Sequence, residues 1–164
     1  MTRRRDGVLE PAERAAFLPT GERLAAGPVV VIECVENIPC NPCVDACPRG
    51  AITIESDINQ TPDVDVGKCN GCGLCISACP GLAIFVVDAS RADGTAEVSL
   101  PYEYVPLPSV GEAVIALDRG GNEICDASVV RVLSTKALDR TPVVTLSIPR
   151  KHVMDARHFR RKVR

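Results

Sequence analysis

The fold of this chain is decided by the stretch Cys69-Asn-Gly-Cys72-Gly-Leu-Cys75-Ile-Ser-Ala-Cys79-Pro80, which spaces four cysteines by two, two and three residues. A cubane iron–sulfur cluster needs four soft thiolate ligands around one small volume, and two-residue gaps let a single loop present three of them. The three-residue gap begins a helix that turns away, so Cys79 is expected to reach a second cluster. Pro80 then prevents the helix from continuing. The stretch therefore predicts one [4Fe–4S] loop and one ligand contributed to a neighbouring cluster.

A second cysteine run lies upstream and makes an internal repeat with a period of 32 residues. Six positions recur: Cys40, Cys43, Cys47, Pro48, Ala51 and Ile52 return as Cys72, Cys75, Cys79, Pro80, Ala83 and Ile84. Each half is expected to end in a strand, over residues 51–55 and 83–87, and a polar loop over 56–65 separates the halves. The repeat predicts two pseudo-symmetric strand–loop–helix–strand units that share one core.

The upstream run departs from the pattern at its leading cysteine, whose place is taken by Asn37. The nearest upstream cysteine is Cys34, which leaves five residues before Cys40. Either a three-residue bulge lets Cys34 supply the fourth ligand, or Cys34 lies in the core and the site holds a [3Fe–4S] cluster. We favour ligation, because Cys34 lies at the end of the expected first strand, residues 29–32. Exchange of the last cysteine of each run gives cluster one the ligands Cys34, Cys40, Cys43 and Cys79, and cluster two the ligands Cys69, Cys72, Cys75 and Cys47.

The cysteines also indicate a compartment and a class of site. Nine of the 164 residues are cysteine, and we find neither an export signal nor a membrane span in the sequence. We therefore expect a cytoplasmic protein, in which closely spaced cysteines bind metals rather than form disulfides. Zinc is the alternative, since paired cysteines also suit tetrahedral zinc. However, zinc has no use for this spacing followed by proline.

The rest of the chain is expected to surround the cysteine domain, which covers residues 28–93 and ends in a linker over 89–94. Residues 1–27 should form an N-terminal arm with a short helix over 10–17. Residues 94–149 should form a small antiparallel β domain, in which Arg119-Gly-Gly-Asn122 predicts a hairpin turn. Pro149 is expected to start a final helix, carrying His152 to Arg161, within a basic C-terminal tail over 150–164. The strands expected in the β domain cover residues 96–100, 112–118, 123–134 and 141–148.

Charge is divided unevenly along the chain. Residues 1–23 and 150–164 hold 12 of the 19 basic and 5 of the 21 acidic residues, which leaves these ends at +7 and residues 24–149 at −9. Basic ends can indicate nucleic-acid binding, but no recognisable nucleic-acid motif accompanies them here. We expect no nucleic acid as a partner and interpret the basic ends as docking or solvated segments.

No catalytic residue is predicted. His152 and His158 lie six residues apart, which is not the spacing of a helical metal pair, and both are interpreted as solvated or interface residues. Cys125 stands alone in an expected strand and is interpreted as a small buried hydrophobic residue. Arg49 and Lys68 adjoin the cysteine runs and either tune a cluster electrostatically or are ordinary surface residues. No phosphate-binding or dinucleotide motif is present.

Residues 29–88 resemble the bacterial two-[4Fe–4S] ferredoxins, and the run from Cys69 to Pro80 with its partner run carries the likeness. The resemblance implies the paired ferredoxin-like arrangement, with two [4Fe–4S] clusters near opposite ends of a short path for electrons. The expected fold class is therefore α+β: a pseudo-twofold dicluster domain, then a small antiparallel, barrel-like β segment and a C-terminal helix.

A narrower likeness rests on three phrases and the appended β segment: Val31-Ile-Glu-Cys34, Ile38-Pro-Cys-Asn-Pro-Cys43 and Pro80-Gly-Leu-Ala-Ile-Phe85. They are similar to small iron–sulfur subunits of bacterial flavin dehydrogenase complexes that oxidise amino acids or related amines, with hydroxyproline, proline and opine types among them. This similarity implies a hetero-oligomer in which the chain relays electrons from an FAD-dependent oxidoreductase subunit and neighbours a [2Fe–2S] subunit. A free-standing soluble ferredoxin and a zinc-binding interaction module are the alternatives.

Overall fold

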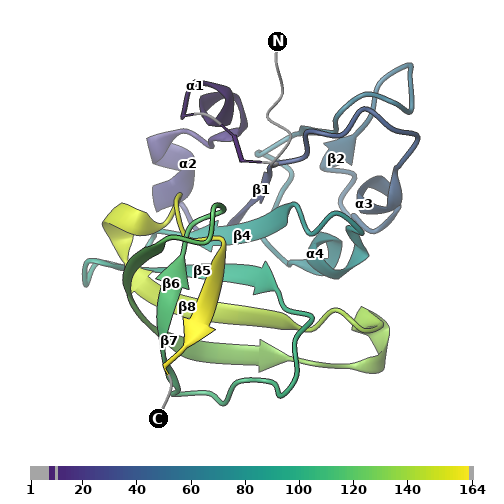
Figure 1. Ribbon diagram of the computed structural model, residues 1–164. Coiled ribbons are helices and arrows are strands. Elements are labelled where there is room, and N and C mark those ends of the chain that lie inside the picture. Colours follow the sequence, from purple (N-terminus) through teal and green to yellow (C-terminus); the bar gives the residue numbers. More distant parts are fainter. Residues whose placement is uncertain (1–7, 10, 163–164) are drawn as a thin grey trace.

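The computed structural model describes residues 8, 9 and 11–162, and strands dominate this part of the chain (Figure 1). Seven of the described strands form one antiparallel sheet, in the order β1-β4-β5-β8-β7-β6-β9, and β2 pairs with β3 in a separate ribbon. The strands are β1 (Val29–Ile32), β2 (Ile52–Thr53), β3 (Asp63–Val64), β4 (Ile84–Asp88), β5 (Thr95–Pro101), β6 (Ala113–Leu117), β7 (Glu123–Leu133), β8 (Val143–Pro149) and β9 (His158–Arg161).

The helices are short and lie mostly around the cysteine region and the arm. They are α1 (Pro11–Arg14), η1 (Ala15–Phe17), α2 (Gly21–Ala25), α3 (Pro42–Asp45), α4 (Leu74–Ala78), η2 (Lys136–Leu138) and η3 (Arg150–His152). The arm has a second helix, α2, starting at Gly21, because the Thr20 side chain accepts a hydrogen bond from the Arg23 backbone N–H at 3.3 Å and caps it. No helix in the described part of the chain has the length and apolar character needed to cross a bilayer.

Strands β1 and β4 are buried on both faces, which explains their uninterrupted apolar sequences. Val29 and Val31 pair with Val87 and Phe85 and face one core, which they share with the rest of the sheet. The alternate residues Val30 and Ile32 pair with Val86 and Ile84 and face a second core that contains Cys43, Cys75 and Ile76. The two strands thus form a wall between the cysteines and the β segment.

The large sheet curls around one core, to which the inner faces of all seven strands contribute. Val98, Leu146, Val129, Val114 and Phe159 represent β5, β8, β7, β6 and β9 in it, and each is at most 3% exposed. Burial of an aliphatic side chain of this size contributes about 1.5–3 kcal/mol. The strands predicted over 96–100, 112–118, 123–134 and 141–148 are found as β5, β6, β7 and β8, while the strand predicted over 51–55 is reduced to β2.

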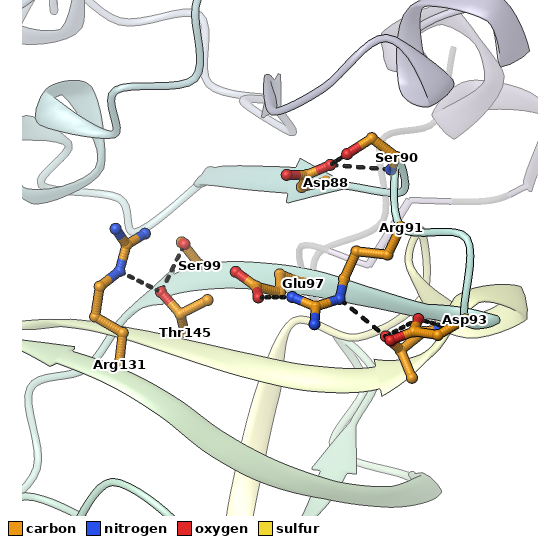
Figure 2. Close-up of polar contacts among 9 residues, drawn as sticks. Asp88, Ser90, Arg91, Asp93, Glu97, Ser99, Arg131 and Thr145 are labelled. Carbon is orange, nitrogen blue, oxygen red and sulfur yellow. Dashed lines mark hydrogen bonds and ion pairs between the residues drawn. The ribbon is translucent and has the colours of Figure 1, made fainter.

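The connection between β4 and β5, where a linker was expected, is held by its own side chains (Figure 2). Asp88 accepts hydrogen bonds from the backbone and hydroxyl of Ser90, and Arg91 pairs with Glu97 at 2.8 Å and with Asp93 at 3.5 Å. β5 pairs with β4 on one side and with β8 on the other. The sheet therefore continues across the expected boundary between residues 93 and 94.

The predicted C-terminal helix is wrong. After Pro149 the chain makes only the short turn η3, and His158–Arg161 is strand β9, paired with β6 from Leu117↔His158 to Val114↔Arg161. The alternation in this segment explains the strand, since Phe159 is buried at 3% exposure and Arg160 points to solvent. Residues 150–162, expected to belong to a basic tail, close the edge of β6.

Candidate functional site

Four cysteines line one cavity at the first cysteine run. Cys34, Cys40, Cys43 and Cys79 surround a cavity of about 150 Å³, which we call site one. Its remaining walls are largely apolar and include Ile32, Ile38, Pro62 and Ile84. Cys34 and Cys40 are half-buried and Cys43 is buried. Cys34 therefore lines the same cavity as Cys40 and Cys43, although five residues separate it from Cys40 in the sequence.

The other four cysteines line a smaller cavity of about 20 Å³, which we call site two. They are Cys47, Cys69, Cys72 and Cys75, joined in the wall by Val30, Ile52 and Val86. Cys72 is exposed and Cys75 is buried. The two groups match the sets expected from the sequence, with Cys47 and Cys79 exchanged between the runs. The assignment of these residues as ligands stays a prediction.

Backbone N–H groups point at several of the sulfurs. Cys69 Sγ accepts from Val30 N and Gly71 N, both at 3.4 Å. Cys47 Sγ accepts from Ala51 N at 3.3 Å, and Cys79 Sγ accepts from Ala83 N at 3.5 Å, so this contact recurs in both halves of the repeat. Such bonds stabilise negative charge on sulfur and are one factor that sets the reduction potential of a cluster.

Burial changes the acidity of the cysteines unequally. Burial, reinforced by neighbouring cysteines, raises the pKa of Cys75 to about 12 and that of Cys43 to about 11. Burial and nearby negative groups also raise the pKa of Cys34. Burial acts to raise the pKa of Cys47 as well, but the backbone N–H groups of residues 49–52 outweigh it, so that pKa is lowered. Because metal binding requires thiolates, loading the buried cysteines releases protons.

The loop of site two is packed against the start of β1. Gly71 has φ +68°, and a Cβ at this position would lie 2.5 Å from Pro28 Cβ and 2.7 Å from Pro28 C. Only glycine fits this approach. Arg23 holds the same loop from the arm, donating hydrogen bonds to the carbonyls of Val66 and Cys69, both at 2.8 Å, and to those of Gly27 and Pro28. Site two is therefore closed by backbone contacts on several sides.

Comparison with known proteins agrees with this geometry. Residues 34–83 match the family described as 4Fe-4S dicluster domain. We call this matched segment the ferredoxin-type domain. The wider chain is 32% identical over 139 residues to "Putative oxidoreductase UacF" of Escherichia coli, covering 81% of this chain and 18% of that protein.

Two further proteins give shorter alignments with this chain. Ferredoxin-type protein NapF of Haemophilus influenzae is 36% identical over 59 residues, covering 35% of this chain and 34% of that protein. Polyferredoxin protein MvhB of Methanothermus fervidus is 32% identical over 118 residues, covering 70% of this chain and 25% of that protein. The chain therefore spans no more than about a third of the length of these relatives. No solved structure matches.

These matches support iron–sulfur binding and electron transfer as the chemistry of residues 34–83. Thiolate ligands hold such clusters, and the cluster itself carries the electron. The part left to the protein is to exclude water, to present N–H groups to sulfur and to place charges nearby.

Three charged residues beside site one were not predicted from the sequence. Glu33, next to Cys34, is 2% exposed and accepts a hydrogen bond from Arg157 Nε at 2.7 Å; Arg157 is 5% exposed. Arg157 Nη2 lies 2.6 Å from the same Glu33 oxygen, but only Nε has hydrogen-bond geometry. Arg119 Nη1 lies 3.8 Å from the other carboxylate oxygen. A charged residue directly after an apolar strand was a visible signal, but the sequence did not show its partners.

The structure also places Cys125, His158 and His152, which the sequence analysis singled out. Cys125 is half-buried and packs on the core of the large sheet. His158 is half-buried beside Tyr102 and Tyr104, with ring centroids at 5.9 and 5.4 Å, and burial lowers its pKa, so it is not a solvated residue. His152 lies 3.9 Å from an Asp155 oxygen. None of these three residues lines either cysteine cavity.

Arg49 and Lys68 meet at the edge of site two. Arg49 lines its cavity and donates a hydrogen bond to the Lys68 carbonyl at 2.7 Å. The Lys68 side chain is 61% exposed and lies 3.4 Å from Asp65. Of the two, Arg49 lines the cavity of site two and Lys68 does not.

Proposed function

We propose that this chain is an electron-transfer subunit that carries two [4Fe–4S] clusters and relays electrons from an FAD-dependent partner within a dehydrogenase complex. Cluster one is held by Cys34, Cys40, Cys43 and Cys79, and cluster two by Cys47, Cys69, Cys72 and Cys75. The observation that carries the proposal is the grouping of eight cysteines around two cavities, four at each.

The residues present suit this cofactor. Each cavity is lined by four cysteines, and four thiolates are the ligand number of a [4Fe–4S] cluster. Apolar side chains form much of the remaining wall, and this keeps water away from the sulfurs. Cys34 lines the same cavity as Cys40, Cys43 and Cys79, which supports a four-ligand site over a [3Fe–4S] site.

The chain's own residues bring the two sites together. Cys43 lies on α3 and Cys75 on α4, and both contribute to one core with Ile52 and Ile76. Cys47 and Cys79 follow these helices and reach the opposite site. A bound cluster supplies one-electron uptake and release. Because Cys47 and Cys79 each line the cavity of the other run, helices α3 and α4 connect the two sites and set the distance between them.

The proposed partner rests on the parts of the chain outside the cysteines. Arg23 and the shared wall of β1 and β4 pack the arm and the β segment to the ferredoxin-type domain, and Arg14 joins the arm to Asp155. A small domain that only exchanged electrons in solution would not need these parts, and docking to another subunit is an economical use for them. The resemblance to flavin dehydrogenase subunits makes amino acids or related amines the proposed substrate class of the complex, with a [2Fe–2S] subunit as a further neighbour.

Anaerobic purification tests the proposal. We expect a brown protein with iron and sulfide sufficient for two clusters, and co-purification with a flavin-containing subunit when the native complex is isolated. A colourless protein that contains zinc would contradict the cofactor assignment. A monodisperse monomer that reduces diffusible acceptors unaided would instead support a free-standing ferredoxin.

A further inference from the structure

Arg119 brings a positive charge from the β segment to the wall of site one. It lies in the turn between β6 and β7 and lines the same cavity as Cys34, Cys43 and Cys79. Its guanidinium carbon is 5.8 Å from the centroid of the Phe85 ring, on the wall strand β4. A residue distant in sequence from the cysteines is therefore part of the site.

The turn that carries Arg119 is well fixed. Asp118 Oδ1 accepts a hydrogen bond from Asn122 N at 2.8 Å, and the Gly121 N–H donates to the Asp118 carbonyl at 3.1 Å. Gly121 has φ +85°, which glycine adopts without strain. The geometry of the turn limits where the Arg119 side chain can go.

The buried carboxylate of Glu33 lies closer to Arg157 than to Arg119. Glu33 makes its close contacts with Arg157, whose guanidinium also lies 4.9 Å from the Phe85 ring, and Arg119 is the second cation beside the same carboxylate. Two arginines and one glutamate give this group a net charge of +1. The Arg119 side chain is 25% exposed, so water screens its field only in part. Glu36 also lines the cavity but is exposed, and Asp118 lies beside Arg119 outside it.

We propose that Arg119 raises the reduction potential of cluster one, so that the β segment tunes the ferredoxin-type domain. The inference rests on the proposed function. Reduction adds one electron, supplied by the reduced flavin partner, to a site that already carries four thiolates, and no bond to the protein forms or breaks. A cation at the cavity wall favours the more negative, reduced state.

The chain offers a matched control at the other site. Arg49 lines site two as Arg119 lines site one, and its guanidinium donates a hydrogen bond to the Lys68 carbonyl. A variant of Arg49 should therefore change the potential of the other cluster. A shared effect of lost charge on the whole molecule would move both potentials together.

The test is a potentiometric titration followed by electron paramagnetic resonance, with dithionite as reductant and the full chain purified anaerobically. In Arg119→Gln, one of the two one-electron couples should become about tenfold harder to reduce, which is about 59 mV, and the other should not move. Arg119→Lys should stay within about threefold of the parent, because it keeps the charge. Arg49→Gln should move the couple that Arg119→Gln leaves in place.

Several results would overturn the inference. One is an Arg119→Gln variant that keeps both clusters and both reduction potentials. Another is an Arg119→Lys variant whose potential shifts as far as that of Arg119→Gln. The third is a shift of the same potential in the Arg119 and Arg49 variants. If Arg119→Gln loses its clusters, Arg119→Met provides the same measurement, because it keeps an aliphatic stem beside Phe85. A parent chain without iron would instead overturn the proposed function, and this inference with it.

Discussion

The loop of site two is held by contacts with residues 23–30, whereas the wall of site one includes a side chain from the more distant β segment. At site two, Gly71 touches Pro28, Arg23 binds four carbonyls, and the cavity is about 20 Å³. At site one, the cavity is about 150 Å³ and its wall includes Ile38, which is 50% exposed, and Arg119 from the β segment.

This difference separates two ways of controlling a redox site. Where the loop is fixed against β1, the hydrogen bonds from N–H groups of both segments to sulfur are fixed with it, as at Cys69. Where the loop is widened, as between Cys34 and Cys40, side chains from other segments, such as Arg119, form part of the cavity wall. Site two is thus expected to respond to changes in packing, and site one to changes in distant charges and in its covering loops.

The largest expected effect is that of Cys72→Ala. Loss of this ligand should abolish cluster two and also damage cluster one, because Cys75 and Cys43 share one core and metal binding is coupled to folding. Iron content and the resonance signals of both clusters measure the result. Normal folding with both clusters intact would show that the ligand assignment is wrong.

Cys34→Ser is the matched variant at site one. Because Cys34 is the proposed ligand at the end of the widened gap, its loss should leave cluster two in place. Cluster one should lose about one iron and change to the [3Fe–4S] type. An unchanged iron content and unchanged signals would indicate that Cys34 is a core residue.

Gly71→Ala should be the next largest effect. The new Cβ would meet Pro28 backbone atoms at 2.7 and 2.8 Å in a left-handed conformation, so we expect a loss of about 2–4 kcal/mol in the free energy of unfolding. Chemical denaturation of the loaded protein under anaerobic conditions measures it.

The control for this substitution is Gly50→Ala. Gly50 also has positive φ, at +57°, but a Cβ there would have nothing within 4 Å. The expected cost is therefore only the conformational one, about 1 kcal/mol. Equal losses in the two variants would mean that the contact with Pro28 does not matter.

Arg23→Ala should loosen site two by a smaller amount. It removes the donor for the carbonyls of Val66, Gly27, Pro28 and Cys69, and we expect a loss of about 1–3 kcal/mol in the free energy of unfolding. Cluster two should be lost to chelators faster, while the rate for cluster one is unchanged.

Arg14→Ala controls for the loss of an arginine from the same arm. Arg14 pairs with Asp155 at 3.0 Å in a partly exposed position, so its removal should cost no more than about 1 kcal/mol and leave both chelation rates unchanged. If both variants accelerate the loss of both clusters alike, the arm stabilises the fold as a whole and does not single out site two.

The smallest expected effect is that of Asn37→Ala. Asn37 Nδ2 donates to the Asn59 carbonyl at 3.0 Å and joins the widened loop to residues 56–62 at the edge of site one. We expect a cost of about 0.5–1 kcal/mol and a faster loss of cluster one in air, with cluster two unchanged. Time courses of the two resonance signals after exposure to oxygen provide the measurement. Faster loss of cluster two than of cluster one would show that Asn37 does not act at site one.

The comparison also explains what the sequence could predict. Continuous apolar runs and the Gly-Gly turn correctly indicated β1 and the strands of the β segment, because these signals are local. The repeat likewise indicated which cysteines would lie together. The final segment was misinterpreted as a helix, since the pairing of His158–Arg161 with β6 depends on an edge that no local pattern describes.

The charged residues beside site one could not be predicted from local sequence patterns for a similar reason. Glu33 and Arg157 are 124 residues apart, and nothing near either of them specifies the pair. Arg119 was visible only as part of a turn, although the same turn places it at the cavity wall. Side chains that act through tertiary contacts cannot be assigned from the spacing of motifs.

The pairing of Glu33 with Arg157 has a consequence for the order of events during synthesis. The cysteines of both sites leave the ribosome well before Arg157, and until then Glu33 lacks its closest counter-charge. A carboxylate in that state stays in water, because burial without a counter-charge is costly. The wall beside site one therefore closes only after strand β9 begins to emerge, and assembly of the first cluster site is completed after translation of nearly all of the described chain.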